Sequence, residues 1–153
     1  KGLSLSPDKV LSGAATERTV GDLMQPPVPP IREGATLMEI ADRFLTSPNN
    51  FLPVVDARLR LVGVVALQDL KEYLNAGEEL RAIIAYDVMR PPPPCVTPNQ
   101  QLLEVLSVVL ASEQRNIPVV NTLKENRLIG ALARAQVLNV FAEAIAASSR
   151  TGT

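Results

Sequence analysis

One phrase occurs twice in this sequence, and it restricts the fold more than any other feature. Each occurrence has an apolar residue, then Pro-Val-Val, a polar turn, an apolar pair, a glycine and a run with helical spacing. The first begins at Phe51 and the second at Asn116, an offset of 65 (116 minus 51). The later glycines, Gly63 and Gly130, are 67 apart (130 minus 63), so the second copy has two extra residues in its turn. A length change at this point is typical of a surface hairpin loop.

Each copy predicts the element order β-α-β-β-α. A short apolar run at Ile31 or Val96 predicts the first strand, and Thr36 with Glu39 forms a capping box before the helix of copy one. Apolar runs bounded by turn residues predict buried strands at 51–55, 61–66, 116–120 and 127–132. Apolar residues at helical spacing predict the core-facing side of each helix: Leu37, Ile40, Ala41, Phe44, Leu45, then Leu67, Leu70, Leu74; and Leu102, Val105, Leu106, Val109, Leu110, then Val137, Phe141, Ala144, Ile145.

The predicted fold class is therefore α+β, with tandem β-α-β-β-α repeats in one pseudo-two-fold body. We expect a linker from the preceding part of a longer host at 1–18, copy one at 19–77, a linking helix and copy two at 78–147, and a tail at 148–153. The linking helix is expected over Glu78–Met89. A unit of about 60 residues buries too little surface to be stable alone, so we expect the two sheets to pack together.

Composition excludes several function classes. Fifteen basic and sixteen acidic residues give a net charge of -1, without the basic excess typical of a nucleic-acid-binding protein. The chain has no histidine and one cysteine, Cys95, so it cannot build a His-Cys zinc site or a histidine-activated nucleophile. We therefore expect no enzymatic activity, no catalytic residue and no metal site. No apolar run approaches the roughly 20 residues of a membrane helix, so we expect no direct membrane insertion of this segment.

The order Asp-Leu-Met, short strand, capped helix, apolar-Pro-Val-Val and Leu-Val-Gly-Val-Val-x-x-x-Asp-Leu resembles the cystathionine-beta-synthase (CBS) domain. The resemblance covers roughly residues 19–146, and two such domains in tandem form a CBS pair, or Bateman module. It implies a regulatory module attached to a channel, transporter or enzyme, often one that binds ATP, ADP or AMP in the clefts between the copies.

The resemblance also implies two candidate clefts. A Gly-x-x-(Thr/Ser)-x-x-Asp motif would supply a ribose acceptor and a hydroxyl, but Ala66 and Ala133 stand at the hydroxyl positions. The first cleft would combine Asp69, Val96, Asn116, Ile117 and Pro118, and the second Ile31, Phe51, Leu52, Pro53 and Gln136. The first has the carboxylate without an aromatic ring, whereas the second has the ring of Phe51 but Gln136 in place of the acid.

Other interpretations of these residues stay open. Asp69 in the first turn of a helix would also interact favourably with the helix dipole. Phe51 would serve equally as a core residue. The module as a whole has a structural alternative, in which it binds no ligand and only dimerises and stabilises its host.

The proline runs at 26–30 and 91–94 resemble those of the cytosolic carboxy-terminal CBS pair of bacterial ClC-type chloride channels. That resemblance implies a module that modulates ion transport at the cytoplasmic side of the inner (plasma) membrane, next to the transmembrane part of its own host chain. Another transporter or a metabolic enzyme is the alternative host. We also expect a homodimer through Leu103 and Val108, because the copy-two helix is apolar there, beyond its core-facing side.

Overall fold

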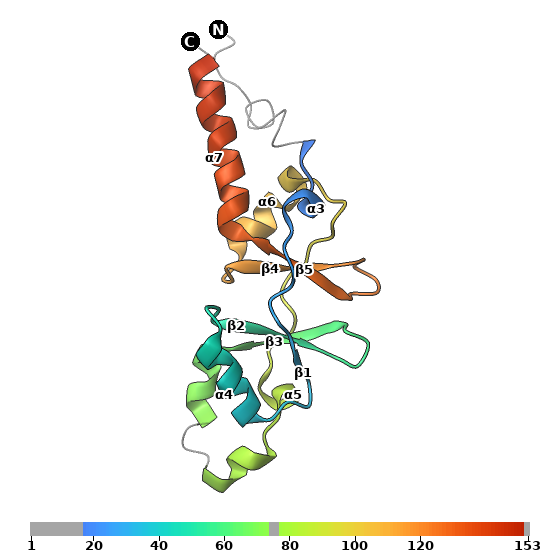
Figure 1. Ribbon diagram of the computed structural model, residues 1–153, viewed down its shortest axis with the longest axis vertical. Coiled ribbons are helices and arrows are strands. Elements are labelled where there is room, and N and C mark those ends of the chain that lie inside the picture. The colour runs from blue at the N-terminus through green and yellow to red at the C-terminus, as the bar shows by residue number, and fades with distance from the viewer. Residues whose placement is uncertain (1–16, 74–76, 152–153) are drawn as a thin grey trace.

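The two copies form two halves of one elongated body, stacked along its long axis (Figure 1). The structure, a computed structural model, describes residues 17–73 and 77–151, so the linker expected at 1–18 lies almost wholly outside the described residues. One half contains the sheet β1-β2-β3 and the other the sheet β4-β5. The α+β class expected from the repeat is confirmed.

The strands predicted at Ile31, 51–55, 61–66, 116–120 and 127–132 lie where the sequence predicts them, to within one residue, whereas the strand predicted at Val96 does not form. Copy one contains β1 (Ile31–Arg32), α4 (Leu37–Thr46), β2 (Phe51–Val55), β3 (Leu61–Ala66) and a 3-10 helix (Leu67–Tyr73). Copy two contains α6 (Leu102–Ala111), β4 (Asn116–Val120), β5 (Leu128–Ala133) and α7 (Arg134–Thr151). The remaining elements are α3 (Val20–Leu23), a second 3-10 helix (Gly77–Ala82) and α5 (Ala85–Val88). In place of a counterpart to β1, Val96 makes a single parallel bridge with Val119.

The hairpins of the two copies join the halves. The Leu61 N–H donates to the carbonyl oxygen of Asn126 at 2.9 Å, and the Leu128 N–H donates to that of Leu59 at 3.0 Å. The side-chain amide of Asn126 adds a hydrogen bond to the carbonyl oxygen of Leu61 at 2.8 Å. These bonds hold the two sheets together at their turns, as the marginal size of each copy requires.

The start of each copy packs on the other copy, which the sequence did not reveal. Val20 of α3 belongs to the core of copy two, and Ala85 and Val88 of α5 belong to the core of copy one. Figure 1 shows α3 beside α6 and α5 beside β1. This exchange carries Arg90, two residues after the end of α5, to the edge of β3, where it forms a backbone bridge with Val64.

Two helix predictions need correction. The last helix of copy one is a 3-10 helix, described over Leu67–Tyr73, and Leu74 lies outside the described residues. The single helix expected over Glu78–Met89 is broken by Ile84, which pairs with Thr36 in extended conformation. α7 runs to Thr151, so the described part of the expected tail, 148–151, is helical.

The predicted core-facing sides of α4 and α6 need two corrections. Leu45 and Leu110, at equivalent positions near the ends of the helices, are exposed rather than buried, and so is Ala41 of α4. Leu45 lies about 100° around the helix from Phe44, at the margin of the buried side. Conversely, Leu103 and Val108 are half-buried and pack against the core of copy two. Among the described residues, no helix is both long and apolar enough to cross a membrane.

Candidate functional site

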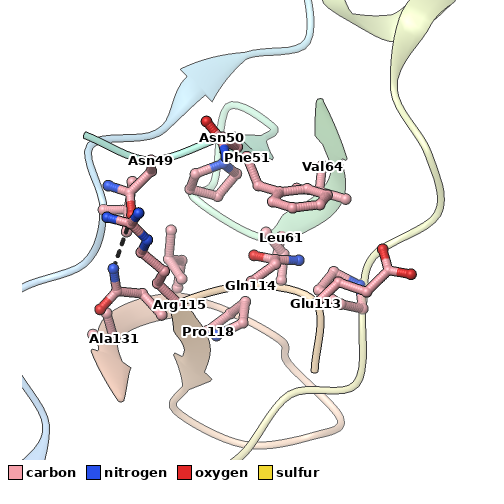
Figure 2. A pocket seen from close by; sticks show the side chains of 16 residues that line it. Asn49, Asn50, Phe51, Leu61, Val64, Glu113, Gln114, Arg115, Pro118 and Ala131 are labelled. Carbon is pink, nitrogen blue, oxygen red and sulfur yellow. Dashed lines mark hydrogen bonds between the residues drawn. The ribbon is translucent and has the colours of Figure 1, made fainter. Parts of the chain in front are cut away.

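A cleft opens between the two halves and is lined by both copies. It consists of two adjoining pockets that share Phe51, Val64, Pro93, Glu113, Gln114 and Pro118. Their cavity volumes are about 100 and 280 Å³, so the cleft is a shallow, solvent-open site, smaller than the roughly 300–1,000 Å³ of a typical small-molecule pocket. Figure 2 shows the Phe51 ring projecting into the first pocket above Gln114 and Leu61.

An ion pair stands at the edge of this cleft. Arg90, a lining residue of the second pocket, donates from Nε to Asp69 Oδ2 at 2.6 Å and from Nη2 to Asp69 Oδ1 at 2.8 Å. The guanidinium carbon also lies over the Phe51 ring, 6.0 Å from its centroid. Both side chains of the pair keep about a third of their surface exposed, 35% for Arg90 and 28% for Asp69. The pair is therefore accessible to a ligand in the cleft.

The hydrogen bonds and charge of Arg90 hold the pKa of Asp69 below its ordinary value, and the same pairing raises the pKa of Arg90. Asp69 is thus ionised at neutral pH. Each of its oxygens accepts one hydrogen bond from Arg90, and a carboxylate has about four acceptor positions, so acceptor capacity remains for a ligand hydroxyl. Asp69 lies in the first turn of its 3-10 helix, as the helix-dipole interpretation expects, and its main side-chain partner is Arg90.

The residues predicted for the first cleft separate into two groups. Pro118 lines both pockets and Asn116 lines one. Asn116 also donates to Asn49 Oδ1 at 2.9 Å, which ties the two copies together beside the cleft (Figure 2). Val96 and Ile117 are fully buried in the core of copy two, so their side chains support the cleft without lining it.

The second predicted cleft is not assembled as expected. Ile31 and Leu52 are buried in the core of copy one, and Gln136 is exposed on α7 outside the lining of either pocket described above. Pro53 lines the first pocket. Phe51 lies near the segment that carries Asp69. In the pairing of β2 with β3, Phe51 is opposite Ala66, which is three residues before Asp69. Arg90 connects the ring and the carboxylate that the sequence assigned to different clefts: it lines the second pocket with Phe51 and binds Asp69, which itself lines neither pocket.

One pair of equivalent residues, Arg43 in copy one and Val108 in copy two, makes the surroundings of the two proline runs different. Arg43 of α4 donates from Nη1 to the carbonyl oxygens of Pro29 and Pro30, both at 3.2 Å. The equivalent residue in copy two, 65 positions later (108 minus 43), is Val108, which lines the cleft with Pro93 and Pro94. A short side chain in copy two thus leaves open the space that a long one covers in copy one.

The residues that sequence reasoning missed are Arg90, Glu113 and Gln114. Arg90 follows Asp-Val-Met in copy two where copy one has Gln25, so the signal was a charged residue that the repeat does not share. Cys95, expected to be a small buried residue, is half-buried and donates to the carbonyl oxygen of Pro93. Burial raises the pKa of its thiol to about 11.

The family model of the CBS domain matches residues 20–76 and 84–143 of this chain. Among curated proteins, the methylated protein MJ0556 of Methanocaldococcus jannaschii is 25% identical over 99 residues, which are 63% of this chain and 55% of that protein. The chain spans about half the length of the curated relatives it matches.

Two solved structures extend the comparison. The complex of CBSX2 with AMP is 27% identical and has a TM-score of 0.66, over 82% of this chain and 97% of that one; CBSX2 is a CBS-pair protein of Arabidopsis thaliana. The CBS domain of the bacterial CNNM/CorC family Mg²⁺ transporter, in complex with ATP, is 21% identical with a TM-score of 0.66, over 86% of this chain and 89% of that one. At 21% identity the second likeness shows the shared fold.

Proposed function

Because this chain belongs to the CBS domain family, we propose that it is a regulatory CBS pair that binds one adenine nucleotide in the cleft beside Arg90. The observation that carries the proposal is that Arg90, which lines the open cleft with Phe51, contacts both the Phe51 ring and the Asp69 carboxylate. The ring offers an apolar surface for a base, the carboxylate an acceptor for ribose hydroxyls, and the guanidinium a donor for phosphate. The AMP complex of CBSX2 supports adenine nucleotides as the ligand class.

Asp69→Ala is expected to weaken the binding of AMP, ADP or ATP about tenfold or more, because a charge-assisted hydrogen bond to the ribose is lost. Isothermal titration calorimetry of the purified chain measures this change. Asp42→Ala is the matched control, because Asp42 is an exposed carboxylate on α4 away from the cleft, and its affinity should equal that of the wild type. Equal affinity in Asp69→Ala and wild type would exclude Asp69 from the site.

The competing function is a structural module without a ligand. Its support is the replacement of the motif hydroxyl by Ala66 and Ala133 in both copies. In that case the ion pair between Asp69 and Arg90 would be an internal bridge between the copies and nothing more. Absence of heat with all three nucleotides at millimolar concentration would favour this function over the first.

We propose that the host is a membrane transport protein whose ion flux the module modulates from the cytoplasmic side. The likeness to the CBS domain of a CNNM/CorC family Mg²⁺ transporter supports a transport protein as the host. The ClC-type chloride channel is the specific host that the proline runs indicated. In this structure, however, those runs have local roles, since Arg43 binds the carbonyls of Pro29 and Pro30, and Pro91, Pro93 and Pro94 line the cleft.

Chloride flux through the reconstituted full-length protein tests this host. Chloride flux that AMP or ATP alters would support the ClC-type host, and flux of other ions alone would contradict it.

A two-fold homodimer is the proposed assembly. Leu103 keeps partial exposure on α6, and Leu110 of the same helix is 54% exposed, so an apolar surface remains for a second copy. Leu103→Arg should shift the chain toward monomer in analytical ultracentrifugation, because a two-fold axis places both new charges at the same contact. A wild-type chain that sediments as a monomer at tens of micromolar would contradict the dimer.

A further inference from the structure

The turns of the two hairpins, residues 56–60 and 121–127, lie next to each other and form what we call the hairpin surface. Backbone hydrogen bonds join them, from Leu61 to Asn126 and from Leu128 to Leu59. Figure 1 shows both turns projecting on the same side of the body, away from α4 and α7. The surface has four exposed basic residues and two acidic ones, a net charge of +2 in a chain of net charge -1: Arg58, Arg60, Lys124 and Arg127, with Asp56 and Glu125.

Two arginines of this surface stand directly opposite each other. Arg60 and Arg127 form an antiparallel bridge between the two joining hydrogen bonds. In such a pair the Cα atoms are about 4.5 Å apart and the side chains leave the same face of the sheet, where like charges destabilise the pairing. Each guanidinium has one carboxylate partner, Asp56 at 2.7 Å for Arg60 and Glu125 at 3.0 Å for Arg127. Because a guanidinium carries five N–H donors, both keep donors for an external anion.

The turns do not require this excess of positive charge. Asp56 Oδ1 accepts the backbone N–H groups of Arg58 and Arg60, so this carboxylate forms part of its turn. The equivalent residue in copy two, 65 positions later (121 minus 56), is Asn121, whose Oδ1 accepts the Arg127 N–H at 3.0 Å. The turn of copy two therefore keeps the hydrogen bond to its arginine without the negative charge.

Two leucines accompany the basic residues, and one of them is strained. Leu59 has a φ of 64° and is 46% exposed. Leucine adopts this left-handed conformation at a cost, whereas the equivalent residue of copy two is Asn126, with a φ of 60°, a residue type that tolerates it. Leu123, on the other turn, is 65% exposed. Backbone strain that serves no contact in the core is a sign of function, so the exposed leucine at this turn indicates an interaction.

The shape of the hairpin surface favours one kind of partner. None of its residues lines either pocket of the cleft, so the leucines stand on projecting turns. A protein partner would need a pocket shaped for each leucine, whereas a fluid bilayer accommodates them without one. Leucine surrounded by lysine and arginine is the combination that binds at the boundary of an anionic membrane, with the cations on the phosphate headgroups.

We propose that the hairpin surface is a peripheral docking site for an anionic lipid bilayer. Arg58, Arg60, Lys124 and Arg127 contact the headgroup phosphates, and Leu59 and Leu123 reach the headgroup boundary. The contact is peripheral, and no segment of this chain crosses the bilayer in it. This inference rests on the proposed membrane host for the presence of a bilayer, but it does not depend on nucleotide binding.

Flotation of the purified chain with lipid vesicles tests the docking site. One set of vesicles is phosphatidylcholine alone, and the other contains about 30% phosphatidylglycerol, which gives a negative surface. At about 50 mM NaCl the wild type should bind the anionic vesicles about thirtyfold more tightly than the neutral ones, because the net charge of the hairpin surface is attracted to them. At about 500 mM NaCl this preference should disappear, because salt screens exposed charges.

Variants at the hairpin surface separate its two components. The double variant Arg60→Gln with Arg127→Gln should lose the preference for anionic vesicles. Its matched control, Lys71→Gln with Arg81→Gln, removes the same charge from exposed residues outside the hairpin surface and should change the affinity less than about twofold. Leu59→Asn, which copies Asn126, should weaken vesicle binding about fivefold and raise the melting temperature, because asparagine tolerates the left-handed conformation.

The outcomes distinguish this proposal from its alternatives. Equal affinity of the wild type for both kinds of vesicle, or the same loss in the control as in the arginine variant, would overturn the docking site. Binding of polyglutamate that requires Arg60 and Arg127, without binding of vesicles, would also overturn it and identify an acidic protein as the partner. Titration of the arginine variant with AMP should give the wild-type affinity, so failure of vesicle binding leaves the nucleotide site in place, and failure of AMP binding leaves the docking site in place.

Discussion

Gly63→Ala is expected to lower the free energy of unfolding by about 3 kcal/mol, at the upper end of the usual cost of overpacking. A methyl group at this position would lie 2.6 Å from Met89 Sδ and 2.7 Å from the carbonyl oxygen of Arg90. The thioether is the flexible end of a side chain and can move, but the carbonyl belongs to the backbone. That carbonyl accepts the Val64 N–H at 3.1 Å, so the substitution pushes apart the bridge that joins α5 and Arg90 to copy one.

Urea denaturation followed by circular dichroism measures this loss. Gly34→Ala is the matched control, because a methyl group there meets no atom within 4 Å, and its unfolding free energy should stay within about 0.5 kcal/mol of the wild type. Gly130→Ala, whose methyl group would lie 2.9 Å from the carbonyl oxygen of Gln25, should be destabilised in the same way. A Gly63→Ala protein as stable as the Gly34→Ala control would show that the two segments separate without cost.

The strands and the duplication were predictable because both are local patterns. Runs such as Phe51–Val55 and Asn116–Val120 are apolar, rich in valine and bounded by turn residues, and all five residues of each run form a strand. The exchange of α3 and α5 between the cores was not predictable. An offset of 65 residues shows which positions are equivalent, but it does not show on which half each segment packs. A chain in which the first segment of each copy packed on its own copy would show the same offset of 65 residues.

The candidate site was predictable only in part for the same reason. The motif position identified Asp69, and the phrase before Pro-Val-Val identified Phe51, but neither gave their spatial relation. The register of β2 and β3 places Phe51 opposite Ala66, three residues before Asp69. Arg90 contacts both residues because α5 crosses to copy one. The sequence assigned the ring and the acid to separate clefts because their relation depends on strand pairing and on the crossing of α5, which no local pattern shows.

Val108→Arg is expected to reduce the affinity for AMP about a hundredfold, while the free energy of unfolding changes by about 1 kcal/mol or less. In copy one the equivalent Arg43 lies across the carbonyls of Pro29 and Pro30. In copy two the corresponding carbonyls are those of Pro94 and Cys95, 65 positions later. An arginine at 108 should bind them in the same way and fill the cleft that Val108 now lines. Titration calorimetry and thermal unfolding of the same samples measure the two effects.

Charge and volume have to be separated in this experiment, because a new guanidinium could itself attract a phosphate. Val108→Leu adds volume without charge and should cost less than tenfold in affinity, since one extra methylene covers only part of the opening. A Val108→Arg protein that binds AMP more tightly than the wild type would show that the arginine joins Arg90 at the phosphate, and the cleft would then not be closed as in copy one.

The reverse change, Arg43→Val, should open the space beside Pro29 and Pro30 without creating a second site. Gln136 stands there where the first site has Asp69, so the stoichiometry should stay at one nucleotide per chain.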